Sequence, residues 1–149
     1  MKKLLLSIDQ GTTSSRSILF DLKGNKIFSS QFEFQQIFPN SGWVEHNPEE
    51  IWKVTLKTIK EAIRKSKNLK SKIISIGITN QRETTILWDK VTGKPIYNAI
   101  VWQDRRTQKI CENLKKRKLE NSFRKKTGLF IDPYFSATKV KWVLDNVSL

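Results

Sequence analysis

The chain has little of what disulfide scaffolds, zinc sites and membrane spans require. It contains one cysteine and one histidine in 149 residues, which excludes an internal disulfide and argues against a zinc site. No apolar run approaches the roughly 20 residues of a membrane-spanning helix. The run that begins at Leu4 is interrupted by Asp9 and is too short for the core of a secretory signal. Because a lone free thiol favours a reducing compartment, we expect a cytoplasmic protein without a membrane partner.

Acidic residues are scarce as well. The 14 Asp and Glu residues are outnumbered by 28 Lys and Arg residues, giving a formal net charge of +14. Such a surface can attract nucleic acid or other polyanions. Only seven of the 28 cations are arginine, however, and arginine is the residue that contacts phosphates and bases bidentately. The balance favours a solvated, lysine-rich surface over a nucleic-acid partner.

The apolar pattern predicts an α/β fold, a mixed sheet with flanking helices. Two apolar runs at 4–8 and 17–20 are separated by a polar turn, and a third extended segment covers 27–34, which predicts an antiparallel meander. A capped helix follows at 47–67. The isoleucine-rich run at 73–79 is typical of a buried strand. Further strands and helices complete a pattern that is not a series of βαβ units.

The predicted helix carries an apolar stripe. Trp52, Leu56, Ile59 and Ile63 recur at steps of three or four residues, the spacing of one helix face. We expect this stripe to pack on the sheet and the lysines to lie on the opposite side.

The first candidate site is the polar turn between the first two strands. An acid, a glycine, four consecutive hydroxyl residues and an arginine stand together there. A carboxylate can hold Mg²⁺, glycine permits close approach of the backbone, and N–H groups and hydroxyls can cradle phosphate. A P-loop would end in Gly-Lys-Ser/Thr and lead into a helix, so this is a different kind of turn. An ordinary hairpin turn is the simpler alternative. The candidate residues are Asp9, Gly11, Thr12, Thr13, Ser14 and Arg16.

The second candidate site begins with a charged pair, Arg82 and Glu83, at the end of the isoleucine-rich run. If the backbone turns there, the guanidinium can donate and the carboxylate can accept hydrogen bonds from neighbouring hydroxyls of a polyol. Trp102 could pack against the carbon chain of such a ligand, and Tyr134 could add a hydroxyl. A structural Arg–Glu pair with a core tryptophan explains the same residues equally well.

Five blocks of the sequence, taken in order, support the ligand-binding interpretation. The chain resembles the N-terminal region of the glycerol kinases, which belong to the FGGY carbohydrate kinases of the actin-like ATPase superfamily. The likeness covers nearly the whole chain. The blocks are 9–16, 42–46, 77–85, 97–103 and 131–136.

The resemblance implies a ribonuclease H-like, actin-like ATPase domain over 1–149, truncated and without its second domain. It implies ATP-dependent phosphorylation of glycerol, with ATP and Mg²⁺ as cofactors and a homo-oligomer for the full-length protein. Arg82, Glu83, Tyr134 and Trp102 would bind glycerol. Asp9 would hold the metal, and the nucleotide phosphates would meet Gly11, Thr12, Thr13, Ser14 and Arg16.

The resemblance also implies that the catalytic aspartate lies beyond the last residue of this sequence. Asp104 and Asp132 do not stand at matching positions, so we assign no catalytic residue and expect this chain alone to be inactive. Two alternatives stay open at this point. One is another polyol or sugar kinase of the same family, and the other is a retained half-domain that acts as a basic binding module.

Overall fold

The computed structural model describes residues 1–147, and the chain divides into two compact units. Unit 1 comprises Met1–Gln35 and Asn47–Gln81, and unit 2 comprises Gln36–His46 and Arg82–Leu149. Neither unit is a single stretch of sequence, because the segment 36–46 leaves unit 1 and returns to it at the start of a helix.

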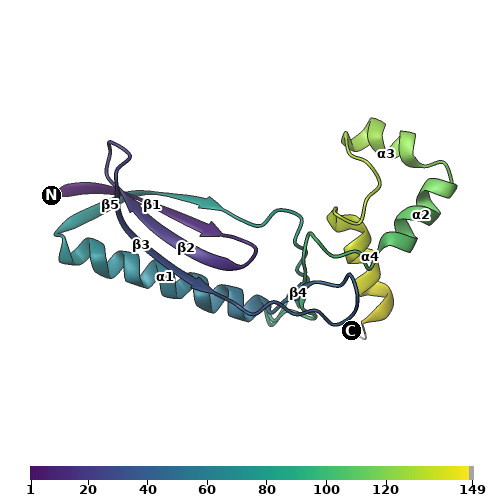
Figure 1. The fold of residues 1–149 in the computed structure, drawn as a ribbon, viewed down its shortest axis with the longest axis horizontal. Coiled ribbons are helices and arrows are strands. Elements are labelled where there is room, and N and C mark those ends of the chain that lie inside the picture. The colour runs from purple at the N-terminus through teal and green to yellow at the C-terminus, as the bar shows by residue number, and fades with distance from the viewer. Residues whose placement is uncertain (148–149) are drawn as a thin grey trace. The chain divides into compact units, whose positions relative to one another are not determined.

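Unit 1 is a four-stranded mixed sheet with one helix on it (Figure 1). The strand order is β3-β2-β1-β5, with β1 antiparallel to β2, β2 antiparallel to β3, and β1 parallel to β5. The predicted meander and mixed sheet are therefore confirmed. The elements are β1 (Lys2–Gln10), β2 (Ser14–Phe20), β3 (Lys26–Glu33), α1 (Pro48–Asn68) and β5 (Ser71–Thr79).

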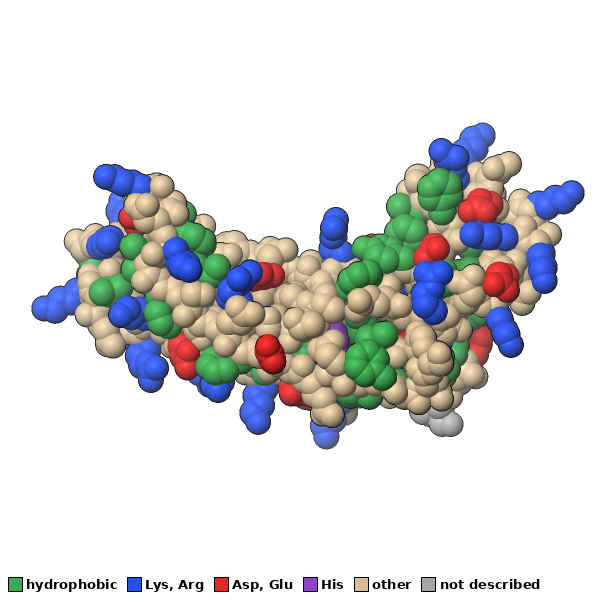
Figure 2. Space-filling model, viewed as in Figure 1, with side chains coloured by type: hydrophobic (Ala, Val, Ile, Leu, Met, Phe, Trp, Pro, Cys, Tyr) green, Lys and Arg blue, Asp and Glu red, His purple; other side chains and the backbone are tan. Residues whose placement is uncertain are grey.

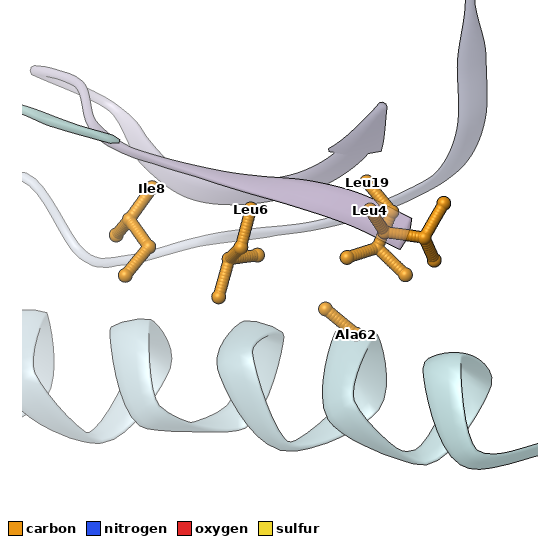
Figure 3. Packing of buried hydrophobic residues seen from close by; sticks show 5 residues of the cluster. All are labelled: Leu4, Leu6, Ile8, Leu19 and Ala62. Atoms are coloured by element: carbon orange, nitrogen blue, oxygen red, sulfur yellow. The ribbon is translucent and has the colours of Figure 1, made fainter. Parts of the chain in front are cut away.

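The core of unit 1 lies between the sheet and α1. Leu4, Leu6 and Ile8 alternate along β1 and point toward the helix, as Figure 3 shows. Leu19 joins them from β2, and Ala62 lies opposite on α1. The period-2 alternation of β1 puts all three of its apolar side chains on one face, so burying this face fixes the strand's register.

The predicted stripe packs only in part. Ile59 packs against the core as a partly buried side chain, but Trp52 and Ile63 are 55% and 39% exposed, so the fully buried face lies one position away along the helix. Strand β2 presents hydroxyl groups to α1 as well as apolar groups. Ser17 Oγ of β2 and Thr58 Oγ1 of α1 lie 2.8 Å apart in a buried hydrogen bond. Small polar side chains therefore approach the sheet where bulky ones were expected. The buried residues of α1 are Ile51, Thr55, Thr58, Ala62 and Ser66.

The isoleucine-rich strand β5 is not buried. Ile74, Ile76 and Ile78 are 45%, 57% and 72% exposed, which overturns the predicted buried strand. The strand pairs with β1 along one edge, and no strand within residues 1–147 pairs with its other edge. An apolar composition indicates that a strand can be buried, whereas its actual burial depends on which elements cover it.

Unit 2 is built from short elements joined by long connections. A two-stranded antiparallel ladder pairs β4 (Glu45–His46) with β6 (Ala99–Ile100). Three helices follow: α2 (Gln108–Lys116), α3 (Glu120–Thr127) and α4 (Ser136–Asn146).

A buried cation organises unit 2. The Arg106 side chain is 0% exposed, and its Nη2 lies 2.7 Å from Oε1 of Glu45 and 2.9 Å from Oδ2 of Asp104. Its guanidinium carbon lies 4.0 Å from the ring centre of Trp43 and 4.5 Å from that of Trp142. Burial by itself would lower the pKa of Arg106, but the hydrogen bonds to Asp104 and Glu45 raise it. The guanidinium therefore stays charged and ties three segments together.

The charged surface is dispersed. Figure 2 shows Lys and Arg side chains scattered over the visible face of each unit, interspersed with apolar and acidic groups. This distribution is typical of solvated lysines. Within residues 1–147, no helix has both the length and the apolar character needed to cross a bilayer.

We predict that Leu6→Ala lowers the free energy of unfolding of unit 1 by about 2–5 kcal/mol, because it removes a buried side chain that the surrounding structure cannot replace. The matched control is Ile76→Ala, since Ile76 is the register partner of Leu6 on β5 and is 57% exposed. Its cost is below about 1 kcal/mol. Urea unfolding followed by circular dichroism measures both. Equal losses would show that β5 is buried in solution.

We predict that Arg106→Leu destabilises unit 2 by roughly 3–5 kcal/mol, because it leaves two buried carboxylates without their cation. Arg105→Leu is the control: its side chain is 54% exposed and lies 3.5 Å from Asp132, a surface pair worth at most about 1 kcal/mol. Tryptophan fluorescence in urea reports on the neighbouring Trp43 and Trp142. A mild effect of Arg106→Leu would contradict the organising role of this cation.

Candidate functional site

The β1–β2 turn is held in shape by its own backbone and by β3. The Gly11 N–H donates to the Ser14 carbonyl at 2.9 Å, and a Cβ on Gly11 would lie only 3.1 Å from that oxygen. The Phe34 N–H donates to the Thr13 carbonyl at 3.3 Å, and Gln31 Nε2 donates to Ser14 Oγ at 2.8 Å. A side chain at position 11 would thus crowd the Ser14 carbonyl, and the turn is braced from one side.

The hydroxyl residues of the turn divide between two faces. Ser15 is buried and accepts a hydrogen bond at 2.9 Å from Thr55 Oγ1 on α1. Thr13 is exposed, and Thr12 and Ser14 are partly exposed. Alternation along the strand therefore assigns Ser15 to the core and leaves the other three hydroxyl side chains at the turn.

Asp9 and Arg16 are cross-strand partners at the mouth of the turn. Arg16 Nη2 donates to Asp9 Oδ2 at 2.9 Å, and the two side chains are 42% and 32% exposed. The Nε of Arg16 is a buried donor without a hydrogen-bond partner among residues 1–147. A partly exposed ion pair contributes little stability, so an anionic or cationic ligand can compete for either partner.

A metal ion at this turn would have few protein ligands. Among residues 1–147, no group of three or more His, Cys, Asp and Glu side chains could hold a metal. One carboxylate, that of Asp9, fits the way Mg²⁺ binds together with substrate phosphates, through one or two carboxylates and several waters. The donor set therefore suits Mg²⁺ brought in with a nucleotide and does not suit a structural metal.

In unit 2 the backbone does turn at the predicted charged pair. Glu83 has φ of 62°, a left-handed conformation that costs a non-glycine residue roughly 1–3 kcal/mol and persists only where neighbours hold it. Arg82 beside it is exposed. The turn removes the geometric objection that adjacent residues on an extended strand point to opposite faces.

Three of the four predicted substrate residues lie in one neighbourhood. The rings of Trp102 and Tyr134 meet edge to face with centres 5.9 Å apart. The Trp102 N–H donates to Thr84 Oγ1 at 3.3 Å, and Ser136 Oγ donates to Glu83 Oε2 at 3.2 Å. Lys139 Nζ joins the carbonyl oxygens of Glu83 and Tyr134, so an acidic residue and the two aromatic residues belong to one neighbourhood.

Sequence reasoning missed Lys139, which is completely buried. Its Nζ donates to the carbonyl oxygens of Glu83 and Tyr134 at 2.7 and 2.8 Å. Burial lowers its pKa from 10.5 to about 8. A signal was present in the sequence, because Lys139 shares a helix face with the buried Val143, at a spacing of four residues.

The two aspartates not assigned a catalytic role are occupied structurally. Asp104 is buried and accepts from the Val44 N–H at 2.6 Å and from Arg106 at 2.9 Å. Asp132 Oδ1 accepts from the Tyr134 N–H at 2.8 Å. A general base must reach the attacking hydroxyl with a free oxygen, and these carboxylates serve the backbone and the buried cation.

The mixed sheet with its braced, hydroxyl-rich first hairpin defines an actin-like ATPase fold, and solved kinases of that class superpose on it. The N-terminal domain of the FGGY family of carbohydrate kinases matches residues 4–148. The chain therefore belongs to the FGGY carbohydrate kinases.

Within this family the chain is similar to glycerol kinases. It is 59% identical over 147 residues to a glycerol kinase of Petrotoga mobilis, covering 99% of this chain and 30% of that protein. A crystal structure of Plasmodium falciparum glycerol kinase with ADP is 40% identical, with a TM-score of 0.91, over 97% of this chain and 29% of that one. Gluconate kinase of Lactobacillus acidophilus, 23% identical with a TM-score of 0.87 over 98% of this chain and 29% of that one, shares the fold. The chain thus spans about 30% of the curated relatives it matches.

Proposed function

We propose that this chain is the N-terminal part of an ATP-dependent glycerol kinase, which transfers the γ-phosphoryl group of ATP to a terminal hydroxyl of glycerol to give glycerol 3-phosphate. The observation that carries the proposal is the 59% identity to a curated glycerol kinase over 99% of the chain. On this proposal, 1–149 is an incomplete N-terminal kinase domain.

The proposed glycerol site lies in unit 2. Arg82 supplies donors and Glu83 acceptors for neighbouring hydroxyls of glycerol, since a guanidinium and a carboxylate offer complementary hydrogen bonds. Tyr134 adds a hydroxyl, and the face of Trp102 packs on the carbon chain. The edge-to-face contact of the two rings at 5.9 Å and the turn at Glu83 support this assignment.

The proposed nucleotide site is the hairpin turn of unit 1. Donors of Thr12, Thr13 and Ser14 meet phosphate oxygens, Gly11 lets the backbone come close to them, and Arg16 adds a cation. Asp9 would hold Mg²⁺, which when bound neutralises phosphate charge. The ADP of the Plasmodium falciparum relative, the braced turn and the Arg16 Nε, which has no hydrogen-bond partner among residues 1–147, support a nucleotide here.

We infer a cytoplasmic location, where ATP is available and the buried thiol of Cys111 stays reduced. We also infer a homo-oligomer for a full-length protein. The lysine-rich surface is solvated on this proposal and has no nucleic-acid partner.

We predict that the chain binds glycerol and that Arg82→Ala weakens the binding roughly 10- to 150-fold, because charged hydrogen bonds contribute about 1.5–3 kcal/mol each. Arg117→Ala is the matched control, since Arg117 is an exposed arginine at the end of α2. Nuclear magnetic resonance titration, followed at the Trp102 indole, measures the dissociation constants.

Three binding results would contradict the proposal or part of it. Unchanged glycerol binding by Arg82→Ala would remove Arg82 from the site. Preference for a five-carbon sugar over glycerol would favour a different kinase of the family. Salt-sensitive binding to a nucleic acid with no polyol effect would instead support the binding-module alternative.

We predict no ATP-dependent phosphorylation of glycerol by this chain alone, because no catalytic base is assigned among these residues: Asp104 is buried against Arg106, and Asp132 does not stand at a matching position. A coupled assay for ADP release, with and without glycerol, provides the measurement. Glycerol-dependent turnover above the rate without protein would show that a base is present among these residues.

A further inference from the structure

The buried face of α4 contains a lysine that the proposed chemistry does not use. Lys139 is 0% exposed, and lysine is almost never fully buried without a partner. The acceptors of its Nζ are two backbone carbonyl oxygens, those of Glu83 at 2.7 Å and Tyr134 at 2.8 Å. These two residues are distant in sequence, and both belong to the proposed glycerol site.

The same helix also holds the Glu83 side chain. Ser136, the first residue of α4, donates from Oγ to Glu83 Oε2 at 3.2 Å. Glu83 is therefore fixed by its backbone oxygen through Lys139 and by its carboxylate through Ser136. This matters because its left-handed φ of 62° is a conformation that relaxes unless the surroundings hold it.

Burial makes the charged form of this lysine costly. Desolvation lowers the pKa of Lys139 from 10.5 to about 8, so the folded chain binds this proton more weakly than the unfolded chain does. Its ammonium consequently opposes folding below about pH 8, and this opposition fades as the pH rises toward 10.5. The ammonium of Lys139 instead holds the carbonyl groups of Glu83 and Tyr134 at a fixed position relative to one another.

We propose that Lys139 is a positioning residue for the substrate site: by binding the carbonyl oxygens of Glu83 and Tyr134, it sets the separation between the carboxylate and the phenol that grip a small polyol. The inference rests on the proposed glycerol-binding function. The charged groups that face Lys139 are Glu83 in the turn, Asp104 and Arg106 before α2, and Asp132 before α4.

The test compares Lys139→Met with Lys141→Met by glycerol titration. Lys141 is on the same helix, and its side chain is 62% exposed. Lys139→Met leaves two buried carbonyls unpaired and lets the Glu83 turn relax, so glycerol binding weakens at least tenfold, about the effect of one lost charged hydrogen bond. Lys141→Met binds as the unsubstituted chain does. Equal binding by all three proteins would overturn the inference.

A series of glycerol titrations at different pH values tests the same role in the unsubstituted protein. General destabilisation of the fold would not produce the expected result. As the pH rises through about 8, Lys139 loses its charge and its hydrogen bonds weaken. Glycerol affinity of the unsubstituted chain then falls, and the carbonyl ¹³C resonances of Glu83 and Tyr134 shift with the same midpoint. Both changes are absent in Lys139→Met.

The outcomes separate this inference from the proposed function. The positioning role alone is overturned if the unsubstituted chain binds glycerol with no pH midpoint near 8 and its carbonyl resonances do not titrate. Failure of the unsubstituted chain to bind glycerol at any pH overturns the proposed function, and the positioning role with it.

Discussion

The guanidinium of Arg106 is the charge on which unit 2 depends. It joins Glu45 of β4 and Asp104 of the loop after β6 through ion pairs of 2.7 and 2.9 Å, and it contacts the ring of Trp142 on α4. A charge taken out of water at such cost is tolerated only when every donor finds a partner. Arg106 thereby joins short elements that have little apolar core of their own. The segments that it connects include α4 and the loop that carries Trp102.

Polar contacts also decide the local geometry around the proposed nucleotide site in unit 1 and the proposed glycerol site in unit 2. In unit 1, hydroxyl pairs such as Ser17 with Thr58 let α1 approach the strands that lead into the Gly11 turn. In unit 2, the ammonium of Lys139 meets two carbonyl oxygens where an apolar side chain would leave both unpaired. Hydrogen bonds form only at specific distances and angles, whereas apolar contacts are less directional. Hydrogen-bonded segments are therefore suited to holding side chains in place for a ligand.

Much of the fold was predictable because it follows from local patterns. The meander, the glycine turn and the Asn47 cap, whose Oδ1 accepts from the Glu49 N–H at 2.9 Å, each depend on a few adjacent residues. The candidate site residues were predictable in the same way, from short motifs. The roles of these residues in binding stay predictions.

The sequence by itself determined the antiparallel meander, the position of the first turn and the family, because those depend on residue types and on the spacing between them. Tertiary structure decided which helix face is buried, that Ile76 and Ile78 lie exposed on β5, and that Lys139 reaches across to Glu83. The physical reason is that burial and hydrogen bonding between distant segments depend on which elements are adjacent in space. Periodicity can indicate an apolar face, but it cannot say what lies opposite it.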